Sequence, residues 1–130
     1  METREPESRF STREAMYSLS KKFAWTINDD MPDWPFEIAQ DVDIKKCIKS
    51  YYRLTDDEQF VLMEAMLFAL NEIENASTFD KYALEISGIL KTDFHLHEYT
   101  VYSWIRHNIE ASEGIKVTPI CLRVWIEMQK

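Results

Sequence analysis

The stretch TDDEQFVLMEAMLFALN, residues 55–71, decides the fold of this chain. Thr55 is followed three residues later by Glu58, which is the spacing of a capping box. In that motif a hydroxyl and a carboxylate each satisfy a free backbone N–H group at the start of a helix. Residues 60–70 are then apolar at every position except one glutamate. Because a helix that is apolar almost all round has to be enclosed by other helices, the stretch predicts a central helix near residues 56–75.

Helical periodicity continues on both sides of this central helix. Apolar residues at three- and four-residue spacing predict amphipathic helices over residues 11–27, 36–39, 44–51, 77–90, 94–109 and 118–126. The 130 residues include only 2 Gly and 4 Pro, too few turn formers for a sandwich or barrel of many strands. We therefore expect an all-α fold, a single-domain bundle of about five to seven helices. Residues 1–9 lack periodicity and are expected to form a flexible tail, with one helical domain over residues 10–130.

Two packing details follow from these helices. Gly88 costs about 1 kcal/mol relative to Ala inside a helix, which favours close helix packing or a bend at that position. The pair Thr118-Pro119 has the pattern of a cap followed by proline in the first helical position, and it predicts the start of the C-terminal helix. The residues of that helix expected to face the core are Leu122, Trp125 and Ile126.

The charge of the chain is uneven along the sequence. The formal net charge is −8, from 15 basic and 23 acidic residues. Two stretches, one between Lys22 and Lys45 and one between Arg53 and Lys81, contain 13 acidic residues and no basic ones. The remainder of the chain has 10 acidic against 15 basic residues. Consecutive helices usually pack side by side, so we expect the two stretches to form one contiguous anionic surface.

Such a surface would repel the phosphates of nucleic acids and of anionic lipids, and it would attract a basic protein. Aromatic rings beside the acids would add contact area, because Trp and Tyr often anchor protein interfaces. The alternative interpretation is that the acids only solubilise the chain and that the rings are core residues. The predicted partner-binding residues are Asp29, Asp30, Asp33, Trp34, Glu37, Asp41, Asp43, Tyr52, Asp57 and Glu64.

The sequence contains no pattern typical of a metal site, a phosphate-binding loop or a catalytic nucleophile. The histidines His95, His97 and His107 have no cluster of further ligands around them, so we expect surface histidines and no metal site. Glu64 is the one carboxylate inside an apolar run. Burial would raise its pKa and suit it to moving protons, although a solvent-facing edge is the simpler interpretation. No phosphate loop or nucleophile motif occurs, so we predict neither catalytic residues, nor a cofactor, nor enzymatic activity.

The two cysteines, Cys47 and Cys121, form no CxxC pair and lie on predicted helices. We expect buried thiols in a reducing cytoplasm, although one structural disulfide stays an alternative. No stretch has the apolar core of a leader peptide or the length of a membrane span, so we expect no cleaved leader and no membrane association.

These features favour a small cytoplasmic protein that binds and inhibits a basic partner. An immunity protein against a cognate toxin, such as a nuclease, is the first class that fits, and a phage-type inhibitor of nucleic-acid enzymes is the next. The alternative is a helical module that self-associates, or a bundle that stores a small apolar ligand between its helices. The expected oligomeric state is accordingly a monomer or a homodimer.

Overall fold

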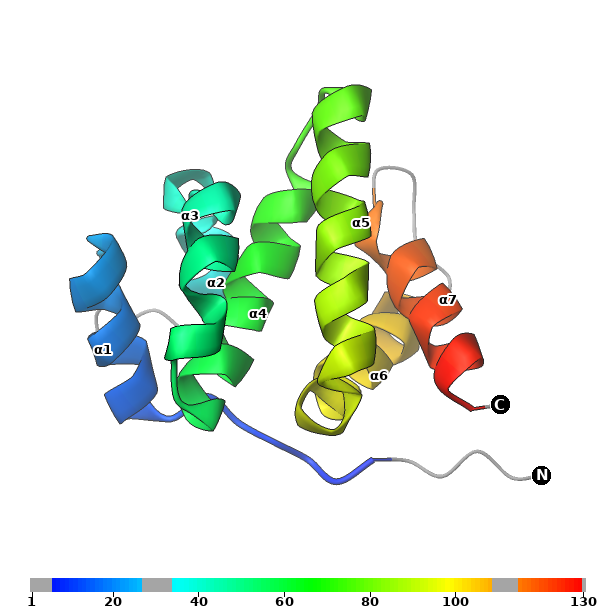
Figure 1. Cartoon of the computed structure of the whole chain (residues 1–130), viewed down its shortest axis with the longest axis horizontal. Helices are drawn as coiled ribbons and strands as arrows, with labels where there is room; N and C mark the ends of the chain where they lie inside the picture. Colours follow the sequence, from blue (N-terminus) through cyan, green and yellow to red (C-terminus); the bar gives the residue numbers. More distant parts are fainter. Residues whose placement is uncertain (1–5, 27–33, 109–114, 130) are drawn as a thin grey trace. The chain divides into compact units, whose positions relative to one another are not determined.

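A computed structural model of the chain describes residues 6–26, 34–108 and 115–129 (Figure 1). Throughout these ranges the protein is helical and contains no strand, which confirms the predicted all-α class. The α-helices are α1 (Arg13–Phe23), α2 (Trp34–Glu37), α3 (Ile44–Ser50), α4 (Asp56–Asn71), α5 (Ala76–Thr92), α6 (Phe94–Asn108) and α7 (Val117–Met128). Two short 3-10 helices, η1 (Ala39–Asp41) and η2 (Tyr51–Arg53), connect them.

The contacts of the chain group it into two compact units, each described by itself below. The first unit is Ser11–Tyr82, and the second unit consists of Met1–Phe10 with Ala83–Lys130. Helix α5 runs through the boundary between Tyr82 and Ala83. The single helical domain over residues 10–130 stays a prediction.

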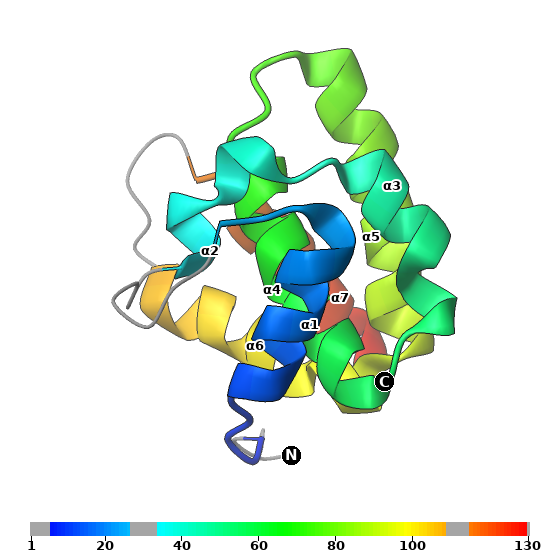
Figure 2. The same cartoon turned by 90° about the vertical axis from the view of Figure 1, so that its left-hand side faces the viewer.

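In the first unit α4 is the centre, with α1, α2 and α3 placed around it (Figure 2). The predicted capping box is confirmed: Oγ1 of Thr55 accepts from the Glu58 N–H at 3.2 Å, and Oε1 of Glu58 accepts from the Thr55 N–H at 3.1 Å. From Phe60 to Leu70 the side chains are buried, apart from part-exposed Glu64 and Phe68. The predicted central apolar helix is therefore present, and it ends at Asn71.

Helix α1 is shorter than its periodicity predicts. Its N-cap is Thr12, whose side chain accepts from the Ala15 N–H at 3.1 Å. Its C-cap is Ala24, which adopts a left-handed conformation with φ 58°. The backbone turns away there, and the buried ring of Trp25 stacks on that of Phe23 with centroids 5.3 Å apart.

In the second unit α6 packs along α7. The ring of Trp125 lies 5.9 Å from that of Phe94 and 5.6 Å from that of Tyr102, between centroids. The second unit also buries aliphatic side chains fully or nearly fully, and they are Ile86, Leu90, Leu96, Val101, Val117 and Val124.

The core-facing residues predicted for α7 were wrong in part, and the close packing that was one explanation of Gly88 is not present. Leu122 is 42% exposed and Ile126 is 53% exposed, so only Trp125 of the three predicted residues faces the core. Gly88 is exposed, and a Cβ built on it meets no atom within 4 Å, so close packing does not explain this glycine.

Candidate partner-binding surface

The α2–η1 segment presents acidic side chains on an anchored backbone. Trp34, at 6% exposed, Ile38 and Ala39 are buried, and both short helices contact α4. Glu37 lies between these apolar residues in the sequence, Asp41 follows them, and both are exposed. Because successive residues of a helical turn point in different directions, burying the apolar set directs the two carboxylates to solvent.

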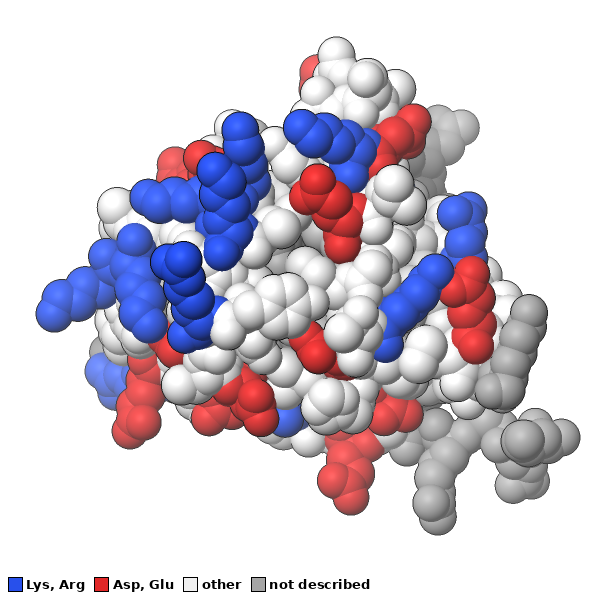
Figure 3. Space-filling model, viewed as in Figure 1, with Lys and Arg blue, Asp and Glu red and all other residues white. Residues whose placement is uncertain are grey.

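Directly after this segment the sign of the exposed charge changes. Asp43 is the N-cap of α3, and its Oδ1 accepts from the Lys46 N–H at 3.2 Å. The same short helix exposes Lys45, Lys46 and Lys49, while Ile44 is buried. Figure 3 shows Lys and Arg side chains gathered over the part of the first unit where Figure 1 draws α1 and α3, with Asp and Glu side chains along their lower border.

At the start of α4 the three acids have different environments. Asp56 and Asp57 are exposed, whereas Glu58 is buried. Oε2 of Glu58 accepts from Nζ of Lys22 at 2.8 Å and from Oγ of Ser18 at 2.6 Å. Burial alone would raise the pKa of Glu58, but the hydrogen bonds from Lys22, Ser18 and Thr55 outweigh it and lower the pKa to about 2. Glu58 therefore holds α1 against α4 as a carboxylate.

Glu64 also contacts the N-terminal part of the first unit. Its Oε1 accepts from Oγ of Ser11 at 3.3 Å. Burial raises the pKa of Glu64 to about 7, and the single hydrogen bond from Ser11 offsets this only in part. The solvent-facing edge expected from the sequence holds only in part for Glu64, because its side chain is part-exposed and one carboxyl oxygen accepts from Ser11, just before α1. Its oxygen is a contact within the unit rather than an open surface group.

Four exposed acids of the second base-free stretch lie at the two ends of α4. Asp56 and Asp57 begin the helix, and exposed Glu72 and Glu74 follow its end. Sixteen residues of α-helix span about 24 Å, roughly three Debye lengths at physiological salt. These four acids therefore form two separate groups with a buried helix between them.

One contiguous anionic surface stays a prediction. Of the ten predicted partner-binding residues, Asp29, Asp30 and Asp33 lie outside the described residues. Trp34 is buried against the unit's own core, as the alternative interpretation of the aromatic residues holds, and offers little of its ring to a partner. Tyr52 is 64% exposed, with its ring edge-on to buried Tyr51 at 4.8 Å between centroids.

His97 is a residue whose environment the sequence interpretation missed. It was expected on the surface, but its side chain is fully buried in the second unit. Burial, together with the charges of Arg9 and His95, lowers its pKa to about 3. Its spacing from Phe94 and Val101, which share one face of α6, was the pattern that would have placed it in the core. The side chain of His107 lies outside the described residues.

No group of three or more His, Cys, Asp or Glu side chains within the described ranges has the geometry to hold a metal ion. Cys47 and Cys121 are buried free thiols, and burial raises the pKa of each to about 12. The structure thus has the two buried thiols that the sequence predicts, and no disulfide joins them.

Among the helices of the described part of the chain, none combines the length and the apolar character that crossing a membrane requires. Comparison of the chain with protein-family models, with curated proteins and with solved structures finds no match.

Proposed function

We propose that this chain is a small acidic binding protein that neutralises a basic protein partner by occluding its active site. An immunity protein of the cytoplasm, acting against a cognate toxin such as a nuclease, is the class that fits this role. The observation that carries the proposal is the α2–η1 segment. There Glu37 and Asp41 are exposed on a backbone anchored by buried Trp34 and Ile38, in a stretch without a basic residue.

The distribution of charge supports the same role. The first unit contains 14 of the acidic and 8 of the basic residues, whereas the second unit contains 9 acidic and 7 basic ones. Most of the net negative charge therefore belongs to the unit that carries α2 and η1. A concentrated field of one sign speeds the diffusional encounter with a partner of the opposite sign.

In the mechanism that we propose, the carboxylates of the α2–η1 segment lie over lysine and arginine side chains of the partner's active site. The anchored backbone keeps these carboxylates in place without a large loss of conformational entropy on binding. Exposed Tyr52 supplies an aromatic contact of the kind that contributes strongly at interfaces. The chain acts by blocking access and performs no chemistry, so it needs neither a metal nor a cofactor.

The test begins with capture of the partner. The tagged chain is used to pull proteins from a lysate of the source cells at low and at high salt, and each captured protein is assayed for toxicity and nuclease activity. We expect a basic toxin that is released at high salt and inhibited by the purified chain. Captured proteins that are acidic, or whose activity the chain does not inhibit, would contradict the proposal.

The binding surface is then tested by association kinetics with that partner. Because two carboxylates are removed from the steering field, Glu37→Gln with Asp41→Asn should slow association about tenfold at low salt and much less at high salt. The matched control is Glu72→Gln with Glu74→Gln, which makes the same charge change just after the end of α4 and outside the α2–η1 segment. Equal slowing by the two pairs would show that only net charge matters and would reject α2–η1 as the binding surface.

A further inference from the structure

Helix α7 is apolar on both of its faces. Its inner face packs in the second unit through Val117, Cys121, Val124 and Trp125, all buried. On the surface of a globular protein, the outer face of such a helix usually carries charged side chains. Instead the outer face of α7 exposes three apolar residues, which are Pro119, Leu122 and Ile126.

These outer apolar residues form one stripe. An α-helix turns by about 100° per residue, so Pro119 and Ile126, seven apart, lie almost in line along the middle of the outer face. Leu122 stands one turn before Ile126 and beside this line. Pro119 and Ile126 therefore occupy the centre of the exposed face, where a partner helix would pack, with exposed Leu122 on one side of their line and exposed Arg123 on the other.

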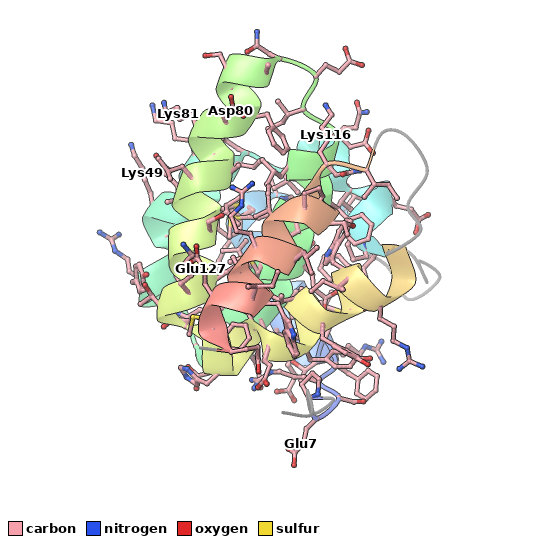
Figure 4. All side chains as sticks on the ribbon, turned by 90° about the vertical axis from the view of Figure 1, so that its right-hand side faces the viewer. Glu7, Lys49, Asp80, Lys81, Lys116 and Glu127 are labelled. Carbon is pink, nitrogen blue, oxygen red and sulfur yellow. The ribbon has the colours of Figure 1, made fainter. Side chains whose placement is uncertain are left out.

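The two charged residues beside the stripe have opposite signs, so those of one copy can pair with those of a second copy. Arg123 and Glu127 lie one turn apart along the same edge of the outer face, and both are exposed. Oε2 of Glu127 pairs with Nζ of Lys91 at 2.6 Å, which holds this carboxylate at the edge of α7 next to α5 (Figure 4). In an antiparallel pair of identical helices related by a two-fold axis, residues at equal distances on either side of that axis face each other.

We propose that the outer face of α7 is an interface between two copies of this chain, with the two α7 helices antiparallel. A two-fold axis level with Trp125 brings Ile126 of the two copies together and places Leu122 against Ile126 of the second copy. The same axis sets Arg123 opposite Glu127 of the second copy, so that two symmetric ion pairs lie along one side of the apolar contact. Contact between the same face of two copies thus buries the apolar side chains and pairs the charged ones.

The contact is small. One face of a 12-residue helix buries less than the roughly 1,600 Å² of a standard interface, so the dimer should have a dissociation constant in the micromolar range and depend on concentration. It is also independent of the proposed inhibitor role, because α7 belongs to the second unit and the acidic α2–η1 segment to the first. Failure of either proposal leaves the other standing.

Leu84 provides a matched control. It is 77% exposed on the part of α5 in the second unit, more than either leucine or isoleucine of the stripe. The residue one turn further is Gly88, which has no side chain, so Leu84 is an isolated exposed leucine rather than part of a stripe.

The test is sedimentation equilibrium of the full chain over a range of about 5 to 500 μM. We expect the average mass to rise from monomer to dimer over this range. Ile126→Glu should weaken the dimer at least a hundredfold, because each copy then buries a charge at the centre of the contact, whereas Leu84→Glu should leave the dimer unchanged. Circular dichroism establishes that each variant is folded, and Leu122→Ser provides a second, milder break of the stripe.

Charge reversal tests the geometry. Arg123→Glu should weaken the dimer about tenfold by placing two acids opposite each other, and adding Glu127→Arg should restore most of the affinity. Since the second change also removes the pair with Lys91, Lys91→Met serves as its control and should dimerise like the unchanged chain. A monomer at all concentrations, a dimer that survives Ile126→Glu, or equal loss with Leu84→Glu would each overturn the proposal.

Discussion

Two glutamates on α4 show how strongly the surrounding contacts can change the pKa of one residue type. Glu58 accepts hydrogen bonds from Lys22, Ser18 and Thr55 and has a pKa of about 2, whereas Glu64 accepts one from Ser11 and has a pKa of about 7. The capping position of Glu58 is readable from its spacing to Thr55. The hydrogen-bond partners Lys22, Ser18 and Ser11 cannot be read from the local sequence, because they are 36 to 53 positions away in the chain.

Stability should respond to pH through Glu64. Its pKa in the folded chain lies above the ordinary 4.5, so its contribution is fully present below pH 4.5 and is lost as the pH rises through about 7. Glu64→Gln removes this titration. The variant should therefore gain roughly 2 to 3 kcal/mol relative to the unchanged chain between about pH 4.5 and pH 8.5, measured by urea unfolding.

Glu58→Gln is the control of opposite sign. The folded pKa of Glu58 is depressed, so its contribution is present above pH 4.5 and lost as the pH falls through about 2. This variant should be less stable than the unchanged chain at neutral pH, with the difference fading in acid. Parallel pH profiles for the unchanged chain and Glu64→Gln would contradict the burial of that carboxylate.

At the scale of the elements, local sequence patterns predicted where the helices lie more accurately than which of their faces are exposed. The capping box at Thr55 and the apolar run after it located α4, because both act within one helix. The end of α1 was missed because it depends on Ala24 adopting a left-handed conformation, which the residue type does not favour. The outer face of α7 was missed because a helix apolar on both sides gives no indication of which side meets the core.

Gly88 provides a test of α5. The helix continues through this residue, and a Cβ there meets no atom within 4 Å, so Gly88→Ala should stabilise the chain by roughly 0.5 to 1 kcal/mol. The gain comes from reduced freedom of the unfolded chain and from the better helix propensity of alanine. Thermal unfolding of the two proteins measures it. A loss of stability would mean that a neighbouring group occupies the space next to Gly88.

At the scale of the whole molecule, the sequence predicted the overall charge and the class of fold, because both are sums over residues. The positions of the acidic side chains in space do not follow from the sequence in the same way. The two base-free stretches looked continuous, yet α4 separates the acids at its ends by about 24 Å and draws Glu58 and Glu64 into contacts with the N-terminal part of the first unit. Of the predicted surface, Glu37 and Asp41 combine exposure with an anchored backbone.

Thiol labelling tests whether the two units unfold together. Cys47 belongs to the first unit and Cys121 to the second, both are buried, and burial raises the pKa of each to about 12. Neither should react with a thiol reagent in the native chain, since the reactive thiolate is scarce and covered. Because α5 continues through both units, we expect both thiols to become reactive at the same urea concentration, followed by mass spectrometry of each peptide. Two separate transitions would contradict the single helical domain predicted from the sequence.

The sequence by itself determined the helices, the central place of α4 and the total charge, since these follow from periodicity, capping and composition within short stretches of chain. Only the tertiary structure decided which acids are exposed, that His97 and Trp34 are buried, and that α7 keeps an apolar face outside. Exposure and pKa depend on which distant residues cover a side chain. Those neighbours are chosen by the packing of whole helices and not by the local sequence.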